Sequence, residues 1–364
     1  MATLRQVERG STSIAASANQ RTITLSTTLL DTTKAVIFHT FEGNHTDTGG
    51  LAITAKIIST TQIQFDRVDS PATATNIEYT VIEWTAGVTV ESGEVAANAG
   101  DTTLSTITDL SKAFLLLSWR DNSNSFNGEF PGGRLYDDSG TKKLNIDSYS
   151  NVTCVYQVVQ YDDCSVQRGT TSWTTETTDT ETITSVDTDK SFVLLSIDGS
   201  TNAGVDAYLV RGHLSNATTL QLDRTGTDVN LVIDWQVVEF TDDTVVREVD
   251  KTINGTTTSD TASFTAMSST ANMLAFTSTW GWAGETDEVA ADPKDAFVAI
   301  TIDSTSQITL TRAAGDSGEY ARFSVYVVEF EPSAVGASIY NLVGSGGLVG
   351  SGGVPVGIGG GLVG

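Results

Sequence analysis

One short segment of alternating polar and apolar residues occurs four times along the chain. The copies are Ile77-Glu-Tyr-Thr-Val-Ile-Glu-Trp84, Cys154-Val-Tyr-Gln-Val-Val-Gln-Tyr161, Ile233-Asp-Trp-Gln-Val-Val-Glu-Phe240 and Phe323-Ser-Val-Tyr-Val-Val-Glu-Phe330, and they end 77, 79 and 90 residues apart. This spacing suits a small β-domain and exceeds the repeat length of most solenoids. The pattern therefore predicts a string of four similar modules.

Other segments recur in step with this strand. Apolar runs at 34–38, 112–116, 190–194 and 272–276 predict a central strand buried on both faces. Alternating segments at 62–67, 143–147, 219–224 and 307–312 predict strands with one packed and one solvated face. With the opening Val-x-x-Gly segments and the Thr/Ser-rich stretches, each module has about six short strands, which is typical of an antiparallel sandwich.

The predicted fold class is all-β, a tandem array of four small antiparallel β-sandwich modules followed by a Gly-rich arm. The expected ranges are 1–86, 87–163, 164–242 and 243–333 for the modules and 334–364 for the arm. Composition supports this fold, because the chain has only five prolines and no long segment of 3.6-residue periodicity. Modules of this size bury little and usually need neighbours or oligomerisation.

The charge narrows the possible partners. The chain has 45 acidic and 20 basic side chains and a net charge of −25, so phosphate-rich surfaces repel it and nucleic-acid binding is not expected. Solubility and resistance to association between strand edges explain this charge; a saline or divalent-rich environment is the alternative. The N-terminal sequence lacks the apolar core of a secretory signal, and no stretch has the ~20 apolar residues that span a bilayer. We therefore expect no membrane insertion, and assembly in a host cytoplasm.

The C-terminal segment differs from the modules. No charged residue follows Glu331, and the last residues alternate Gly and Ser with aliphatic side chains. A flexible linker ordinarily avoids such aliphatic residues, so this segment is suited to docking along another subunit, with simple disorder as the alternative. The candidate docking residues are Leu342, Val343, Leu348, Val349, Val354, Val356 and Ile358.

The sequence does not indicate an enzyme. The three histidines, His39, His45 and His213, have no metal-ligand spacing, and no nucleophile elbow or phosphate-binding loop is present. Oxygen-rich residues from Asp121 to Glu129 offer a weak Ca²⁺ possibility, but their order departs from the EF-hand pattern. No cofactor is expected. Cys154 and Cys164 are predicted to be free thiols.

The longest insertions follow the buried run in every module, at 40–50, 119–134, 198–206 and 278–294. Modules of one topology present such loops at one common edge, and variable loops on a fixed scaffold are where recognition usually occurs. Trp280 and Trp282 in the fourth loop, together with Trp119 and Arg120, are therefore candidate ligand or receptor contacts. Tryptophans that cover their own module core are the alternative.

The repeats also suggest an ion pair. Modules 1, 3 and 4 have Arg67, Arg224 and Arg312 after the alternating strand and Glu83, Glu239 and Glu329 in the recurring strand, whereas module 2 has Ser148 and Gln160. Joint loss of both charges predicts that they pair, across another strand or between modules. Such a pair would be structural and contribute modestly.

The Val-x-Arg/Ser-Gly opening, the Lys-Ala run and the aromatic-x-Val-Val-Glu-aromatic ending resemble repeats in structural proteins of tailed bacteriophages, over residues 7 to 330. They are also loosely similar to the H-type lectin domain; its sugar-binding positions do not align with particular residues of this sequence, so none is transferred. The resemblance implies a homo-oligomeric virion protein of the fibre, spike, collar or capsid-decoration type, in contact with other virion proteins. A receptor-recognition protein that binds host surface glycan, and a cell-surface or matrix filament protein, are the alternatives.

Overall fold

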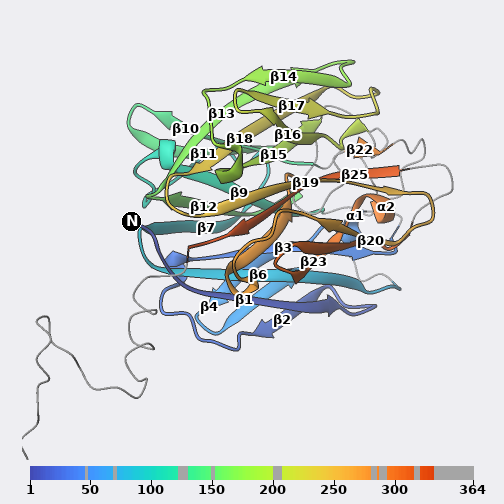
Figure 1. Ribbon diagram of the computed structural model, residues 1–364, viewed down its shortest axis with the longest axis horizontal. Helices are drawn as coiled ribbons and strands as arrows, with labels where there is room; N and C mark the ends of the chain where they lie inside the picture. Colours follow the sequence, from blue (N-terminus) through green and yellow to red (C-terminus); the bar gives the residue numbers. More distant parts are fainter. Residues whose placement is uncertain are drawn as a thin grey trace, which may run out of the picture. The chain divides into compact units, whose positions relative to one another are not determined.

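The computed structural model describes residues 1–45, 48–68, 72–121, 130–148, 152–199, 207–279, 285–286, 293–314 and 320–331. Residues Met1–Glu331 form one compact unit. The predicted fold class is confirmed, because strands dominate and the described helices are single turns (Figure 1). None of these helices has the length and apolar character needed to cross a membrane.

Each module contains an inner and an outer antiparallel sheet. In both sheets the strand that comes last in the chain lies in the middle. The inner sheets are β1 (Thr3–Ile14), β6 (Thr75–Ala86) and β3 (Ala35–Gly43); β7 (Val88–Ala96), β12 (Val152–Tyr161) and β9 (Ala113–Asp121); β13 (Cys164–Trp173), β18 (Leu231–Phe240) and β15 (Ser191–Gly199); β19 (Val245–Asn254), β25 (Tyr320–Glu329) and β21 (Met273–Thr277), with β22 (Glu285–Thr286) also on β25. The recurring segments thus form the central strands β6, β12, β18 and β25. The apolar runs that were predicted to be central form β3, β9, β15 and β21 instead, each at one edge of its sheet, and they are buried because the neighbouring module covers that edge.

The outer sheets repeat the same order. They are β2 (Gln20–Thr24), β5 (Gln62–Asp66) and β4 (Thr54–Ser59); β8 (Thr102–Thr103), β11 (Thr141–Asp147) and β10 (Gly132–Asp138); β14 (Thr178–Thr182), β17 (Thr219–Asp223) and β16 (Arg211–Asn216); β20 (Ser259–Ser263), β24 (Gln307–Thr311) and β23 (Ala299–Ser304). The predicted alternating segments are the middle strands of these sheets, with one buried and one solvated face, as the period of two requires.

A short 3₁₀ turn precedes the third strand in every module. These turns are η1 (Thr32–Lys34), η2 (Leu110–Lys112), η3 (Thr188–Lys190) and η5 (Thr270–Asn272). The side chain of the preceding residue, Asp31, Asp109, Asp187 or Ser269, accepts a hydrogen bond from the first turn. Two α-helical turns, α1 (Thr48–Leu51) and α2 (Pro293–Ala296), follow the third strands of modules 1 and 4.

The predicted pairing of the repeated arginines with the repeated glutamates is wrong. Glu83 accepts hydrogen bonds from the backbone N–H groups of Leu30 and Asp31 and pairs with Arg5. Arg67 instead donates to backbone carbonyls of its own module, and Arg224 and Arg312 do the same in theirs. In module 2, Gln160 takes the place of the glutamate, and its amide oxygen accepts hydrogen bonds from the equivalent backbone N–H groups, those of Thr108 and Asp109.

Glycine in the first strand of modules 1–3 makes room for an aromatic ring in the recurring strand. Gly10 pairs with Tyr79, and a Cβ at Gly10 would lie 2.5 Å from the tyrosine oxygen. The equivalent pairs are Gly93 with Tyr156 and Gly169 with Trp235. Module 4 has a valine at both positions. The larger side chain on the first strand compensates for the smaller one on the recurring strand, so the packing is preserved.

The four modules close into a ring through equivalent hydrogen bonds. At each boundary a backbone N–H in β4, β10, β16 or β23 donates to a hydroxyl that lies in the third strand of the next module or, for Ser278, directly after it. The bonds are Ala55 N to Ser118 Oγ (3.3 Å), Gly133 N to Ser196 Oγ (2.8 Å), Gly212 N to Ser278 Oγ (3.5 Å) and Ile300 N to Thr40 Oγ1 (3.0 Å). We call these boundaries seams 1–2, 2–3, 3–4 and 4–1. Seam 4–1 joins the last module to the first, so in Figure 1 orange strands of module 4 lie beside blue strands of module 1.

Aromatic side chains fill the centre of this ring. The last residues of the four recurring segments, Trp84, Tyr161, Phe240 and Phe330, form a closed cycle with ring centroids 5.9, 5.3, 5.9 and 5.6 Å apart. A second layer from the third strands consists of Phe114, Phe192, Phe276 and Phe38, in consecutive contact at 5.7, 5.3 and 5.3 Å. The array of small sandwiches thereby gains a shared core, which supplies the burial that each module lacks alone.

Candidate functional site

The ring has two different ends. In every module the third inner strand ends where the recurring strand begins; in module 1, Gly43 pairs with Thr75 and Ala35 with Glu83. The expected loops at 40–50, 119–134, 198–206 and 278–294 therefore begin at one common end, which we call the loop end. At the opposite turn end, the chain leaves each recurring strand beside the axial aromatic cycle.

Trp119 supports the base of the loop end. It lies within β9 and not in a loop, is 7 % exposed, and packs on Phe130 at 5.3 Å. Phe130 stacks on Tyr208 of module 3 at 5.0 Å, so these rings join modules 2 and 3 beside a small cavity of about 40 Å³. Trp119 is thus a packing residue in the described structure. Trp280 and Trp282 lie outside the described residues.

Arg120 belongs to an ionic network across seam 1–2. Its guanidinium lies 3.5 Å from Asp66 of module 1 and 2.8 Å from Glu94 of module 2. Lys56 contacts the same two carboxylates at 3.0 and 2.9 Å. Two cations shared between two carboxylates satisfy the partly buried charges, so Arg120 helps to hold modules 1 and 2 together.

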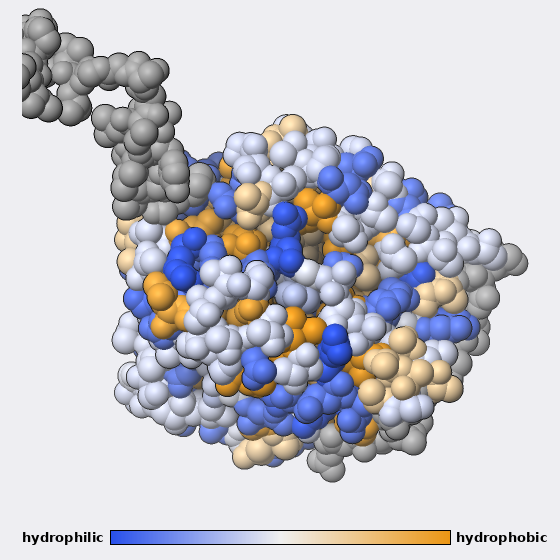
Figure 2. Space-filling model, turned by 90° about the horizontal axis from the view of Figure 1, so that it is seen from below, coloured by the Kyte–Doolittle hydropathy of each residue, from blue (hydrophilic) through white to orange (hydrophobic). Residues whose placement is uncertain are grey.

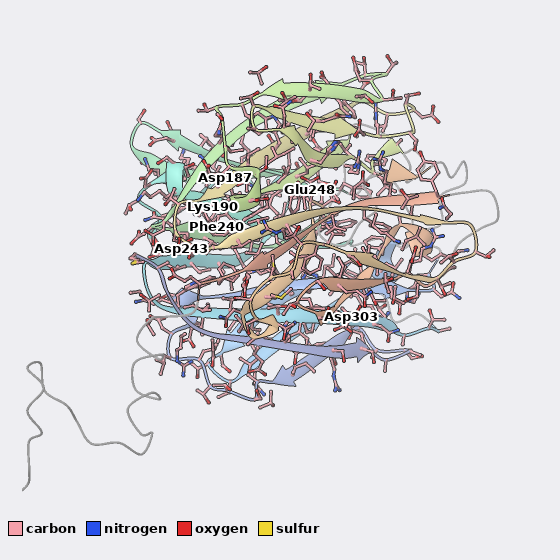
Figure 3. All side chains as sticks on the ribbon, in the orientation of Figure 1. Asp187, Lys190, Phe240, Asp243, Glu248 and Asp303 are labelled. Atoms are coloured by element: carbon pink, nitrogen blue, oxygen red, sulfur yellow. The ribbon has the colours of Figure 1, made fainter. Side chains whose placement is uncertain are left out.

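An equivalent network crosses seam 3–4. The buried Arg211 lies 2.8 Å from Asp223 of its own module and 3.2 Å from Asp250 of module 4, which also pairs with Arg322. Glu248 lies nearby, accepts a hydrogen bond from the backbone N–H of Leu214, and has its pKa raised to about 7 by burial. Figure 3 labels Glu248 on the strand that leads away from the turn end.

The three histidines lie in different surroundings. Burial lowers the pKa of His39 to about 4, His45 contacts Thr73 and Thr75, and His213 lies beside Asp223. Within the described ranges, no three His, Cys, Asp or Glu side chains converge on a metal position. Asp121 ends β9, and its side chain and residues 122–129 lie outside the description. Cys154 and Cys164 are buried free thiols, as predicted, and burial raises both pKa values to about 12.

The turn end carries the acidic turns that link one module to the next. Lys190 donates to the carbonyl of Asp242, and Tyr161 Oη donates to the Asp242 carboxylate at 2.7 Å. Figure 3 shows Lys190, Phe240 and Asp243 together at the end where Figure 1 marks the N-terminus. The chain continues from Phe330 at this end into the arm, whose candidate docking residues lie outside the described residues.

The fourth residue of each recurring segment faces a seam. Gln157 bonds the N–H and C=O of Ile37 at 2.9 and 2.8 Å, and Gln236 bonds those of Leu115 at 2.9 and 3.2 Å. Tyr326 occupies this position in seam 3–4, is fully buried, and donates to the carbonyl of Gly212 at 3.4 Å. The alternation of the strand indicated a buried face here, but gave no sign that a neighbouring module covers it.

Seam 4–1 has only Thr80 at this position, and a cavity of about 210 Å³ opens beside it. Arg9 and Glu78 line the cavity from module 1, and Ala275 and Ile300 line it from module 4. Burial raises the pKa of Glu78 to about 7 and lowers that of Arg9. Within the described residues, neither charged group has a hydrogen bond or an ion pair.

Comparison with known proteins gives no relative from which a role could be transferred. The sequence matches no protein family and no curated protein.

Proposed function

We propose that this chain is a non-enzymatic structural protein of a virus particle, an appendage or capsid-decoration component that docks through residues 334–364. The observation that carries the proposal is the polarity of the ring. The described ring ends at Glu331, close to the pair Met273–Glu329 at the turn end, and the uncharged segment follows in the sequence, whereas the third inner strands end at the loop end. Docking through a segment that begins at the turn end would leave the loop end available, and loops on a fixed scaffold are where recognition usually occurs.

The packing of the ring supports a scaffold role. Its equivalent hydroxyl bonds, axial aromatic residues and ionic networks all serve to join modules. Figure 2 shows one face, on which hydrophobic side chains are dispersed among polar ones. Dispersed apolar residues on this face do not form the contiguous patch that marks a partner site.

Recognition of a host receptor glycan is the alternative function that the sequence suggests, but no described residue favours it. Trp119 is buried, and Arg120 is engaged in seam 1–2. Assembly with other virion proteins, homo-oligomerisation and a virion location belong to the first proposal.

Immunogold electron microscopy of native material, with antibody against residues 1–333, tests the location. Discrete label on virus particles is expected, and label on cell envelopes or free filaments would contradict the virion role. Particles assembled with a chain truncated after residue 333 should lack the protein, since the docking segment is missing. The matched control, Trp280→Ala with Trp282→Ala, should incorporate normally; if it alone loses host binding, receptor recognition is the better proposal.

A further inference from the structure

We propose that the cavity at seam 4–1 binds a free amino acid with a primary carboxamide side chain, with L-glutamine as the probe. The proposal does not depend on where the protein resides. It starts from the internal comparison that the four equivalent seams permit. In three seams the side chain at this position hydrogen-bonds backbone groups of the neighbouring module, whereas among the described residues Thr80 makes no such bond in seam 4–1.

The exposed backbone groups define the first part of the ligand. Ala275 pairs with Val327, in the same register in which Ile37 pairs with Val81 and Leu115 with Val158. The N–H and C=O of Ile37 and Leu115 point into their seams and bind a glutamine amide, so those of Ala275 point into seam 4–1. No hydrogen bond satisfies them from the described residues. A carboxamide presents the required acceptor and donor side by side.

The charged residues define the second part. Arg9 lies directly opposite Thr80 in the β1–β6 register, and Glu78 lies two residues from Thr80 on the same strand. All three therefore project from one face of the sheet, about 5 and 7 Å apart. A group seated over Thr80 lies between a guanidinium and a carboxyl group. The α-carboxylate and α-ammonium groups of an amino acid match this pair.

The size of the cavity agrees with this assignment. Gln157 and Gln236 place a carboxamide on the neighbouring backbone from a Cα in the recurring strand. A free glutamine over the short Thr80 side chain spans the same gap, and its α-groups remain in the part of the cavity next to Arg9 and Glu78. The rest of the wall is mixed, and Phe38, Ile300 and Ile302 supply its apolar part, which fits the two methylene groups.

Isothermal titration calorimetry on the full chain tests the proposal. The probes are L-glutamine, L-glutamate, which lacks the amide donor, and N-acetyl-glutamine N-methylamide, which lacks both α-charges. L-glutamine should bind at least ~10-fold more tightly than either analogue, the equivalent of ~1.4 kcal/mol. Equal binding of the capped analogue would overturn the assignment to a free amino acid and indicate a glutamine side chain of a peptide. No binding of L-glutamine at millimolar concentration would also overturn it.

The decisive variant is Thr80→Gln, which introduces the side chain that Gln157 and Gln236 have in their seams. It should abolish L-glutamine binding and raise the melting temperature, because the new amide satisfies Ala275. Thr22→Gln on the exposed β2 is the matched control and should bind as the unchanged protein does. Glu78→Gln provides a second readout and should weaken binding at least ~10-fold, since it removes the charge opposite the ammonium group. Unchanged binding in Thr80→Gln or Glu78→Gln would refute the site.

Discussion

Replacement of Gln236 by leucine tests whether the seam amides hold the ring together. Gln236 is 8 % exposed and bonds the N–H and C=O of Leu115, which is itself buried. Leucine has a similar volume but no polar atom, so it leaves one donor and one acceptor unpaired in the seam. Each such group costs about 1–3 kcal/mol, and the additional apolar contact recovers part of it, so we expect a loss of about 2–5 kcal/mol in the free energy of unfolding.

Gln167 is a matched control for this change. It makes the same two bonds to one backbone residue, accepting from Thr184 N at 2.6 Å and donating to Thr184 O at 2.8 Å, but at the solvent-exposed surface. Water replaces an exposed amide, so Gln167→Leu should lose no more than about 1 kcal/mol. The assay is urea denaturation of both variants, followed by circular dichroism and compared at equal m-value. Equal losses would refute the argument that burial in the seam sets the cost.

Three further predictions concern other contacts of the ring. Thr40→Val removes the hydroxyl that accepts from Ile300 N at 3.0 Å; we expect a loss of about 1–3 kcal/mol by urea denaturation, and an unchanged midpoint would contradict closure through this bond. Glu248 has a pKa raised to about 7 by burial, so the protonated acid is favoured in the folded state, and its contribution of at most about 3 kcal/mol is present below the ordinary pKa and lost as pH rises towards 7. Melting temperatures across that interval should fall less for Glu248→Gln than for the unchanged protein, and parallel curves would contradict the assignment. Gly93→Val should destabilise by about 1–3 kcal/mol because its Cβ meets the Tyr156 ring, and adding Tyr156→Val should recover part of the loss in a double-mutant cycle; full additivity would show that the two side chains do not exchange volume.

The strand pattern was sufficient for the fold of one module. Alternation over Ile233–Phe240 requires one buried face, and apolar runs such as 190–194 are buried on both faces, so six strands and their order of burial follow from local sequence. Closure of the ring was not predictable in the same way, because it depends on which surfaces of different modules meet. A signal existed in the hydroxyl residues Thr40, Ser118, Ser196 and Ser278, which interrupt otherwise apolar strands at equivalent positions.

The errors in the site have physical causes. Correlated loss of Arg and Glu in module 2 suggested an ion pair, but each residue binds backbone groups of its own module. Trp119 was assigned to a loop because polar residues follow it. In the structure β9 extends through Asp121, and the Trp119 side chain is buried in the protein interior. The absence of an amide bond to Ala275 among the described residues follows from the difference between Thr80 and Gln157. This difference becomes meaningful only when a neighbouring module is known to face both positions.

The continuity of the chain around the ring has a consequence for how its boundaries can change. In a tetramer of identical subunits, dilution would separate the parts, and every substitution would appear at all four interfaces. Here the stoichiometry is set by one polypeptide, so the assembly persists at any concentration and each interface can acquire its own character. Charges gather at Arg120 and Arg211 in two of the seams, whereas seam 4–1 has the short Thr80 where two other seams have a bonded glutamine. Covalent linkage thus permits one specialised boundary while the other three preserve the frame.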